Sequence, residues 1–402
     1  MKILMVNKFL YPRGGSESYM LYLGDHLKSM GHEVEYFGMY DAQNTVGNSA
    51  EAYTQNMDFH STGLSRFLYP FKIIYSFEAY QKIGQVLDRF KPDIVHMNNI
   101  NFQLTPSIIY AVKKRGIPLV QTVHDYQMIC PNHLLYNFDR NTPCEKCVSG
   151  SYLPCIRNKC IHGSPVKSIL GAIEARIYAL LKPYKKVDLF LCPSHFLENK
   201  LLSARSYYGG KTKTIHNFID KERFATTDRQ ADSYIVFVGR LSKEKGVEHI
   251  AQTAKLLPEY TFVVAGSGPD EAVLHGIPNV TMAGFLTGEK LTELMGKAKL
   301  LLLPSVCYEN CPLSILEAHA MGVPVVTMNS GGMAELVKDG LTGTLVNEPT
   351  PEAIARAISK TLEDEAYYTR LQEHCSRERD NILSVETYCD LLMNEYQALI
   401  AR

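Results

Sequence analysis

Short apolar runs alternate with amphipathic stretches along the first half of the chain. The apolar runs predict strands, and the stretches with a period near 3.6 predict helices. The predicted strands are Ile3–Val6, Glu33–Phe37, Ile94–Met97, Leu119–Val123 and Leu189–Cys192. The predicted helices lie around Ser16–Met30, Tyr75–Phe90, Pro106–Arg115 and Val166–Leu181. Strands that alternate with helices indicate a parallel sheet with helices on both faces.

A polar stretch without periodicity, Asn217–Ser233, interrupts this alternation before it resumes. The next predicted strands are Ile235–Val238, Phe262–Ala265, Val280–Ala283, Leu300–Leu303 and Val325–Thr327. The predicted helices are Gly246–Leu257, Glu289–Ala298, Pro312–Met321 and Pro351–Glu363. We therefore predict two doubly wound α/β domains, 1–217 and 218–384, with ligands at the carboxyl ends of their strands and a cleft between them. The amphipathic end of the chain, 385–402, is expected to return as a helix that packs on the first domain.

Length and composition support two globular domains. A chain of 402 residues is too long for one core, and 46% hydrophobic with 21% charged residues is typical of a globular protein. No apolar run approaches a membrane span, and Met1–Lys8 is too short in apolar residues for a signal peptide. We expect a cytoplasmic location, in which the ten cysteines are thiols or metal ligands more readily than disulfides.

The charge is zero overall but is divided unevenly. Residues 1–220 contain 25 Lys and Arg against 17 Asp and Glu, and the remainder contains 17 against 25. A basic first half favours contact with an anionic partner, which would be a phosphate-bearing substrate or a membrane surface. An accidental bias is the alternative, and no nucleic acid is expected as a partner.

Two glutamates flank a predicted helix start after the run Leu300–Leu303. Pro312 suits the first helical position, so Glu309 falls on the preceding loop and Glu317 inside the helix. The free N–H groups near the helix start form an anion site. This arrangement predicts a site that holds a phosphate and several hydroxyls, although a polar loop beside a surface glutamate would give the same letters.

Other polar motifs also follow predicted strands. Gly14-Gly15 lies between the first strand and helix, where backbone N–H groups can approach an anion, but Gly-x-Gly-x-x-Gly is absent. His124 ends a buried strand, where a neutral imidazole can bind a sugar hydroxyl or a carbonyl or can be structural. Arg240 and Lys245 flank a tight loop in the second half and suit a diphosphate.

Taken together, these motifs resemble the retaining glycosyltransferases of glycosyltransferase family 4, which have the GT-B fold. The resemblance follows the chain order, from Gly14-Gly15 and His124 to Gly239-Arg240-Leu241 with Glu244-Lys245-Gly246. It continues through Glu309-x7-Glu317, Gly322-Val323-Pro324-Val325 and Gly331-Gly332 with Glu335. The Glu-x7-Glu element in this context is the most specific part.

The resemblance implies a role for each matching residue. Arg240 and Lys245 would neutralise the diphosphate of a UDP- or GDP-sugar donor, Glu317 would bind the ribose hydroxyls, and Glu309 the hydroxyls of the transferred sugar. His124 would lie near the reacting centre of the sugar. The remaining implied substrate-binding residues are Gly14, Gly15, Glu17, Gly239, Gly266, Phe285, Leu286, Asn310, Cys311, Pro312, Leu313 and Ser314. One departure is the run Asn310-Cys311-Pro312, where the family commonly has a glycine, and it leaves the sugar unidentified.

The resemblance further implies transfer of a sugar, with retention, to a hydroxyl of a glycan or lipid-linked acceptor in bacterial-type polysaccharide or glycolipid assembly. The chain has no Asp-x-Asp pair, so its sequence requires no catalytic metal and no other cofactor. The alternatives are a sugar-nucleotide epimerase on the same scaffold and a non-catalytic GT-B partner subunit.

Five cysteines are concentrated in the loop that follows His124. They are Cys130, Cys144, Cys147, Cys155 and Cys160. Cys144-x2-Cys147 has metal-ligand spacing, thiolates suit zinc, and a long loop needs something to order it. We expect a structural zinc held by four of the five, with reduced thiols, disulfides or an iron–sulfur centre as alternatives.

Two stretches mix basic and apolar residues, namely 65–72 and the helix between Lys167 and Lys186. Both could rest on an anionic bilayer, which would place the protein peripherally at the inner face of the membrane and near a lipid-linked acceptor. A core-facing amphipathic helix would show the same pattern.

Overall fold

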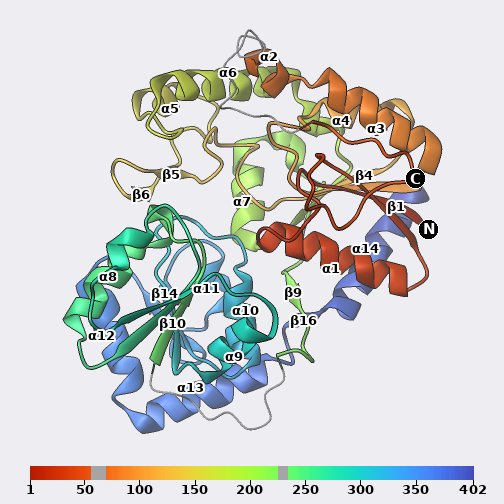
Figure 1. Ribbon diagram of the computed structural model, residues 1–402. Helices are drawn as coiled ribbons and strands as arrows, with labels where there is room; N and C mark the ends of the chain where they lie inside the picture. Colours follow the sequence, from red (N-terminus) through yellow and green to blue (C-terminus); the bar gives the residue numbers. More distant parts are fainter. Residues whose placement is uncertain (56–68, 225–233) are drawn as a thin grey trace. The chain divides into compact units, whose positions relative to one another are not determined.

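A computed structural model describes residues 1–55, 69–224 and 234–402 (Figure 1). Contacts within this part of the chain define two compact units. The N-terminal unit comprises 1–134, 145–216 and 385–402, and the C-terminal unit comprises 135–144 and 217–384. Each unit contains a six-stranded parallel sheet, so the predicted fold class, two doubly wound Rossmann-like domains, is confirmed.

The sheet of the N-terminal unit has the strand order β2-β1-β3-β4-β7-β8. Its strands are β1 (Lys2–Val6), β2 (Glu33–Phe37), β3 (Ile94–Met97), β4 (Leu119–Thr122), β7 (Leu189–Cys192) and β8 (Thr212–Thr214). Its helices are α1 (Gly15–Ser29), α2 (Tyr69–Ile74), α3 (Phe77–Phe90), α4 (Ser107–Lys114), α5 (Leu153–Arg157), α6 (Pro165–Leu181), α7 (His195–Ala204) and α14 (Val385–Ile400). Every residue of β3, β4 and β7 is buried, as expected for strands covered on both faces.

The sheet of the C-terminal unit has the order β12-β11-β10-β13-β14-β15, which is the order of the dinucleotide-binding Rossmann fold. Its strands are β10 (Tyr234–Val238), β11 (Thr261–Ala265), β12 (Val280–Gly284), β13 (Leu300–Leu303), β14 (Val325–Met328) and β15 (Gly343–Val346). Its helices are α8 (Val247–Leu256), α9 (Gly288–Lys297), α10 (Leu313–Ala320), α11 (Met333–Leu336), α12 (Pro351–Leu362) and α13 (Glu365–Glu378). Two small pairings complete it, β5 (Tyr136–Asn137) with β6 (Thr142–Pro143), and β9 (Phe218–Ile219) with β16 (Leu383–Ser384).

Strand order reverses at one place in each sheet, between β1 and β3 and between β10 and β13. Helices on opposite faces leave from the two strands at such a switch point, so the loops after them diverge and leave room for a ligand. The sequence motifs with Gly14-Gly15 follow β1, and those with Arg240 and Glu309 follow β10 and β13. The topology therefore predicts ligand binding at these loops.

A buried hydrogen-bonded chain connects α14 to the N-terminal sheet. The Tyr396 hydroxyl lies 2.5 Å from His96 Nδ1, and His96 Nε2 lies 2.7 Å from the Thr122 hydroxyl. The Tyr19 hydroxyl lies 3.2 Å from Thr122 Oγ1 and 2.6 Å from the Tyr388 hydroxyl. Burial lowers the pKa of His96 to about 3, so this imidazole is neutral. The polar atoms that α14 buries are thus paired.

Several elements differ from the sequence-based expectations. The strands β8 and β15 and the helices α2, α5, α7, α11 and α13 were not predicted. The two strands and the helices α2, α5 and α11 are short, which leaves little periodicity to detect. Residues 135–144 were expected in the first domain, but their contacts group them with the C-terminal unit. There Tyr136 is buried, and burial followed by the nearby Glu244 carboxylate raises its pKa.

Two findings bear on the membrane expectation. In the described part of the chain, no helix combines the length and the apolar character that crossing a bilayer requires. The basic and aromatic stretch 65–72 begins outside the described residues, which exclude 65–68.

Candidate active site

A half-buried ion pair lies at the switch point of the C-terminal sheet. The Lys245 ammonium, at the end of a short 3-10 helix (Lys243–Lys245), donates a hydrogen bond to Glu309 Oε1. The Ser305 hydroxyl donates to the same oxygen at 2.8 Å. Burial alone would lower the pKa of Lys245, but the Glu309 carboxylate raises it above its ordinary value. The Lys245 ammonium is therefore charged, and its carboxylate partner compensates for its desolvation.

Two glycines allow the loops to approach closely enough for this pair. Gly246 has a φ of +76°, and a Cβ atom there would lie 2.1 Å from the Pro304 carbonyl oxygen. Gly331 has a φ of +60°, and a Cβ atom there would lie 2.7 Å from the Glu309 carbonyl oxygen. The next residue, Gly332, donates its N–H to that oxygen at 2.7 Å. Any side chain at the first two positions would thus push the loops apart.

Glu244 connects the loop after β10 to the loop after β13. Its side chain accepts a hydrogen bond from the Ser242 hydroxyl at 2.6 Å and is buried. Its carbonyl oxygen accepts from the N–H groups of Val306 and Cys307 at 3.0 and 3.2 Å. The loop after β10 and the loop after β13 are therefore one hydrogen-bonded unit, which fixes the backbone on both sides of the ion pair.

The loops after β10 and β11 are equally close. A Cβ atom on Gly266 would lie 1.8 Å from the Gly239 carbonyl oxygen, and one on Gly268 would lie 2.2 Å from that of Leu241. Leu241 also donates its N–H to the Ser267 carbonyl at 3.0 Å. Glycine is required at these positions because the neighbouring backbone is too close for a side chain.

Two features beside the ion pair can receive an anion. The Arg240 side chain is exposed and has no hydrogen bond or ion pair within the described residues. Helix α10 begins after Pro312 with no side-chain cap, and Leu313 and Ser314 are half-buried in its first turn. Uncapped N–H groups and a free guanidinium both favour a phosphate.

The remaining predicted donor-side residues have mixed surroundings. Burial raises the pKa of Glu317 to about 7, while Arg223 opposes that shift. Phe285 is 66% exposed, so its ring is available to a planar ligand. Cys311 is buried, its carbonyl oxygen accepts a 2.9 Å hydrogen bond from the Asn217 side chain, and burial raises the pKa of its thiol to about 12. Cys311 therefore anchors the loop, and its thiol is not reactive at neutral pH.

The N-terminal unit contains the other predicted residues. Gly14 and Gly15 are exposed, whereas Glu17 is 5% exposed and accepts a hydrogen bond from Asn7 at 3.2 Å. His124 follows β4, with its Nε2 2.8 Å from Asn98 Oδ1. Burial lowers the pKa of His124 to about 4, so its imidazole is neutral at pH 7.

Sequence patterns alone did not identify the residues that support these side chains. Glu244 belongs to the Glu244-Lys245-Gly246 motif but was given no role, and Ser305 has no distinctive spacing of its own. Asn7 and Asn98 end β1 and β3, and only the strand order brings Asn98 to His124. Their positions directly after predicted strands are the feature of the sequence from which Asn7 and Asn98 could have been predicted.

The five cysteines of the loop do not all come together. Cys147, Cys155 and Cys160 belong to one buried cluster with Tyr152 and Ala172. Cys144 falls in the C-terminal unit by its contacts. A search of the described residues finds no three His, Cys, Asp or Glu side chains that could hold a metal ion as placed.

The loop packing can be tested with a matched pair of glycine variants. Gly276 has a φ of +75°, like Gly246, but open space where its Cβ would be. We expect Gly276→Ala to cost about 1–2 kcal/mol from backbone strain alone. Gly246→Ala should cost roughly 2 kcal/mol more, because its Cβ collides with a backbone oxygen. Denaturant unfolding of the two variants measures the difference, and equal destabilisation would contradict the close approach.

Comparison with known proteins places this arrangement in a family. Residues 13–223 match the family described as Glycosyltransferase Family 4, and residues 218–378 match Glycosyl transferases group 1. An uncharacterized 42.6 kDa protein in the cps region of Klebsiella pneumoniae is 25% identical over 353 residues, covering 84% of this chain and 87% of that protein. The alpha-D-kanosaminyltransferase of Streptomyces kanamyceticus is 30% identical over 39% of this chain and 42% of that protein.

Solved structures agree in fold over the whole chain. Sucrose-phosphate synthase from Thermosynechococcus elongatus has a TM-score of 0.71 at 17% identity, covering 100% of this chain and 99% of that one. HepE of Anabaena in complex with UDP-glucose has a TM-score of 0.69 at 18% identity, covering 99% and 100%. The family match covers more than half of the chain, and this chain therefore belongs to glycosyltransferase family 4.

Proposed function

We propose that the chain transfers a hexosyl group, with retention, from a nucleotide-diphosphate sugar to a hydroxyl of a glycan or lipid-linked acceptor. The observation that carries the proposal is the Lys245–Glu309 pair beside the uncapped start of α10. HepE was solved with UDP-glucose, and the relative from Streptomyces kanamyceticus is described as a kanosaminyltransferase, which supports a sugar-nucleotide donor. The epimerase and partner-subunit alternatives are not favoured, because the matched families are transferases.

The leaving group is the part of the reaction that this site would assist most. Breaking the bond between the sugar and the diphosphate develops negative charge on the phosphate. Lys245, Arg240 and the N–H groups at the start of α10 would meet that charge with fixed positive charge and dipoles. Such preorganised stabilisation is usually the largest catalytic contribution. These cations would do the work of a metal ion in this proposal.

Donor binding would exchange the partners of the ion pair. A diphosphate that contacts the Lys245 ammonium competes with Glu309 for it. Glu309 would then be free to accept hydrogen bonds from the hydroxyls of the transferred sugar, while Ser305 keeps one carboxylate oxygen in place. Lys245 would thus bind the phosphate, and Glu309 would bind the sugar.

His124 would act as a neutral hydrogen-bonding group near the anomeric carbon. Its low pKa means that it carries no positive charge at neutral pH that would oppose the charge developing on the sugar. Its bond to Asn98 fixes the orientation of the ring. In this proposal the departing phosphate accepts the proton of the attacking acceptor hydroxyl, so no protein nucleophile is required.

The donor site can be tested by separating binding from turnover. Arg240→Ala combined with Lys245→Ala should lower the affinity for UDP and GDP by about 100-fold or more, because two charged contacts to phosphate are lost. Glu309→Gln should leave that affinity within about threefold but lower turnover at least about tenfold. Calorimetric titration measures the first effect, and donor hydrolysis across a panel of sugar nucleotides measures the second.

Two matched substitutions control for general disturbance. Lys243→Ala removes a cation from the same 3-10 helix, and Glu348→Gln changes an exposed glutamate of the same unit. Both should behave as the unaltered protein. Retained affinity in the double variant would show that the diphosphate binds elsewhere, and unchanged turnover of Glu309→Gln would remove its assigned role.

A peripheral membrane contact would suit a lipid-linked acceptor at the inner face of the membrane. Helix α6 exposes Val166, Leu180 and Leu181 at 66%, 63% and 64%. Exposed lysines stand near both ends of this helix, namely Lys167, Lys182, Lys185 and Lys186. We expect co-sedimentation with vesicles rich in anionic lipid and its loss when Leu180 and Leu181 become serine, with neutral vesicles as the control. Equal sedimentation of both proteins would contradict this contact.

We also propose structural zinc in the cysteine loop. The thiols fit in kind, because cysteine sulfur is a common zinc ligand and Cys147, Cys155 and Cys160 belong to one buried cluster. The group would have to close further to hold the ion. When bound, zinc would order the loop between β4 and α6.

Metal analysis tests the zinc proposal. Protein purified under reducing conditions should contain about one zinc per chain, and the double variant Cys155→Ala with Cys160→Ala should lose it. Cys192→Ala, which removes a buried cysteine of β7, should keep it. Protein without zinc would leave these cysteines as buried thiols.

A further inference from the structure

Two pairs of polar side chains connect β3 and β4 in the N-terminal unit. His96 Nε2 lies 2.7 Å from Thr122 Oγ1, and Asn98 Oδ1 lies 2.8 Å from His124 Nε2. The second pair follows the first by two positions on each strand, and side chains two positions apart point to the same face of a sheet. His124 therefore belongs to a hydrogen-bonded group on a single face of the N-terminal sheet.

Tyr19 of α1 contacts both pairs. Its hydroxyl lies 3.2 Å from Thr122 Oγ1 of the first pair. Its ring packs against the His124 imidazole of the second pair, with centroids 5.1 Å apart and planes at 71°. Rings at this distance and angle attract each other edge to face, which favours one direction of the imidazole over others. Tyr19 is only 4% exposed and His124 is half-buried, so the Tyr19 ring is part of what shields the imidazole from water.

Helix α14 holds Tyr19 in this position. The Tyr388 hydroxyl lies 2.6 Å from the Tyr19 hydroxyl, and the two rings pack with centroids 5.8 Å apart and planes at 89°. Tyr388 is 1% exposed, so water cannot replace a hydrogen bond that is lost there. Rotation of the Tyr19 ring would break its buried bonds to Thr122 and Tyr388 together. The ring is therefore a fixed support for His124.

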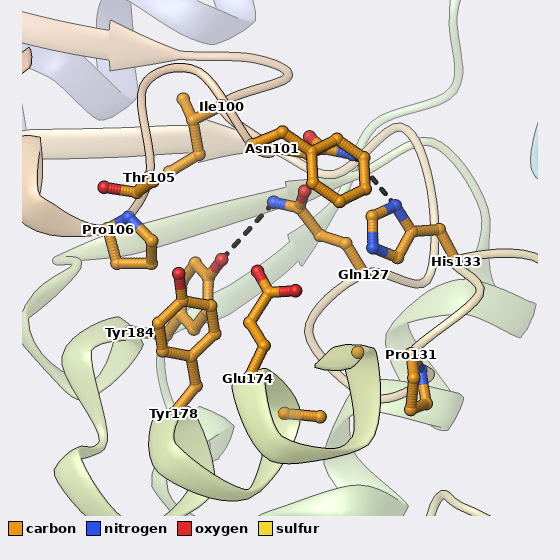
Figure 2. A pocket seen from close by; sticks show the side chains of 13 residues that line it. Ile100, Asn101, Thr105, Pro106, Gln127, Pro131, His133, Glu174, Tyr178 and Tyr184 are labelled. Atoms are coloured by element: carbon orange, nitrogen blue, oxygen red, sulfur yellow. Dashed lines mark hydrogen bonds between the residues drawn. The ribbon is translucent and has the colours of Figure 1, made fainter. Parts of the chain in front are cut away.

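The backbone next to His124 is held by other contacts. Asp125 accepts a hydrogen bond from the Asn101 side chain at 3.3 Å and one from a backbone N–H two residues further on at 2.8 Å. Figure 2 shows Asn101 in the wall of a small pocket beside α6. These contacts fix the chain at Asp125 but do not reach the imidazole. The direction of the imidazole is therefore set by Asn98 and Tyr19.

We propose that Tyr19 is a positioning residue for His124, an assignment that rests on the proposed function. Its ring would hold the imidazole in the direction in which it meets the transferred sugar. A hydrogen-bonding group assists a reaction most when its direction is set before the substrate arrives. Because Tyr19 is buried, it would act through His124 and not by touching the substrate.

The pKa of His124 tests whether Tyr19 shields it. Burial lowers this pKa to about 4, and the nearby Asp125 carboxylate opposes that effect. His96 is a further titratable neighbour, and burial keeps it neutral. Tyr19→Leu would admit water to the imidazole, so the pKa of His124 should rise toward its ordinary value of 6.5. Tyr19→Phe keeps the ring and should leave the pKa near 4. NMR titration of the full chain with labelled histidines measures both, with the signal assigned from His124→Gln.

Turnover tests the positioning role. Donor hydrolysis should fall about tenfold in Tyr19→Leu and stay within about threefold in Tyr19→Phe, because only the first loses the ring. UDP affinity should be unchanged in both variants, since the residues assigned to the donor belong to the C-terminal unit. In a His124→Gln background, Tyr19→Leu should cause no further loss of turnover. A residue that acts through His124 has no effect once His124 is gone.

Tyr396→Phe is the matched control. It breaks the 2.5 Å contact with His96 Nδ1, which belongs to the same buried chain but does not involve Tyr19. It should lower the denaturant midpoint and leave the pKa of His124 and the turnover unchanged. The assignment is wrong if Tyr19→Leu changes neither quantity, or if it lowers turnover equally with and without His124. If even the unaltered protein hydrolyses no donor, the proposed function fails, and the pKa of His124 in Tyr19→Leu still decides whether Tyr19 holds and shields the imidazole.

Discussion

The ion pair between Lys245 and Glu309 is the interaction on which the proposed donor site depends. Two charges removed from water gain little net stability even when paired. Their position therefore has to be imposed by the loops, through the bonds of Glu244 and the glycine contacts at Gly246 and Gly331. A site built in this way holds a cation and a carboxylate ready for a ligand that carries both phosphate and hydroxyls.

Helix α6 has one face that lines a pocket and another that is exposed to solvent. Glu174 and Tyr178 line a neutral pocket on one side, while Ile173 and Leu180 are exposed on another. The cysteine-containing loop packs against the helix at Gly171. A Cβ atom on Gly171 would lie only 2.3 Å from the side chain of Ile161 in that loop. The loop and the helix therefore pack closely at this point.

Burial leaves Lys245 charged but favours the neutral forms of His124 and Glu174. In the C-terminal unit, Lys245 stays charged because a carboxylate accompanies it. In the N-terminal unit, burial outweighs the opposing effect of Asp125 on His124 and raises the pKa of Glu174, so both groups are mostly neutral at pH 7. The first unit is thus suited to neutral hydroxylated groups and the second to a phosphate, which matches an acceptor and a nucleotide donor.

The sequence alone determined the alternation of elements, because buried parallel strands must be apolar throughout and their helices amphipathic. It also identified Arg240, Lys245 and Glu309, since their motifs stand at predicted strand ends. Only the tertiary structure decided that Lys245 and Glu309 pair, because strand order, rather than distance along the chain, brings the ends of β10 and β13 together. For the same reason, the sequence did not predict the pocket that Asn101 and Glu174 line. These two residues lie 73 positions apart and share no motif.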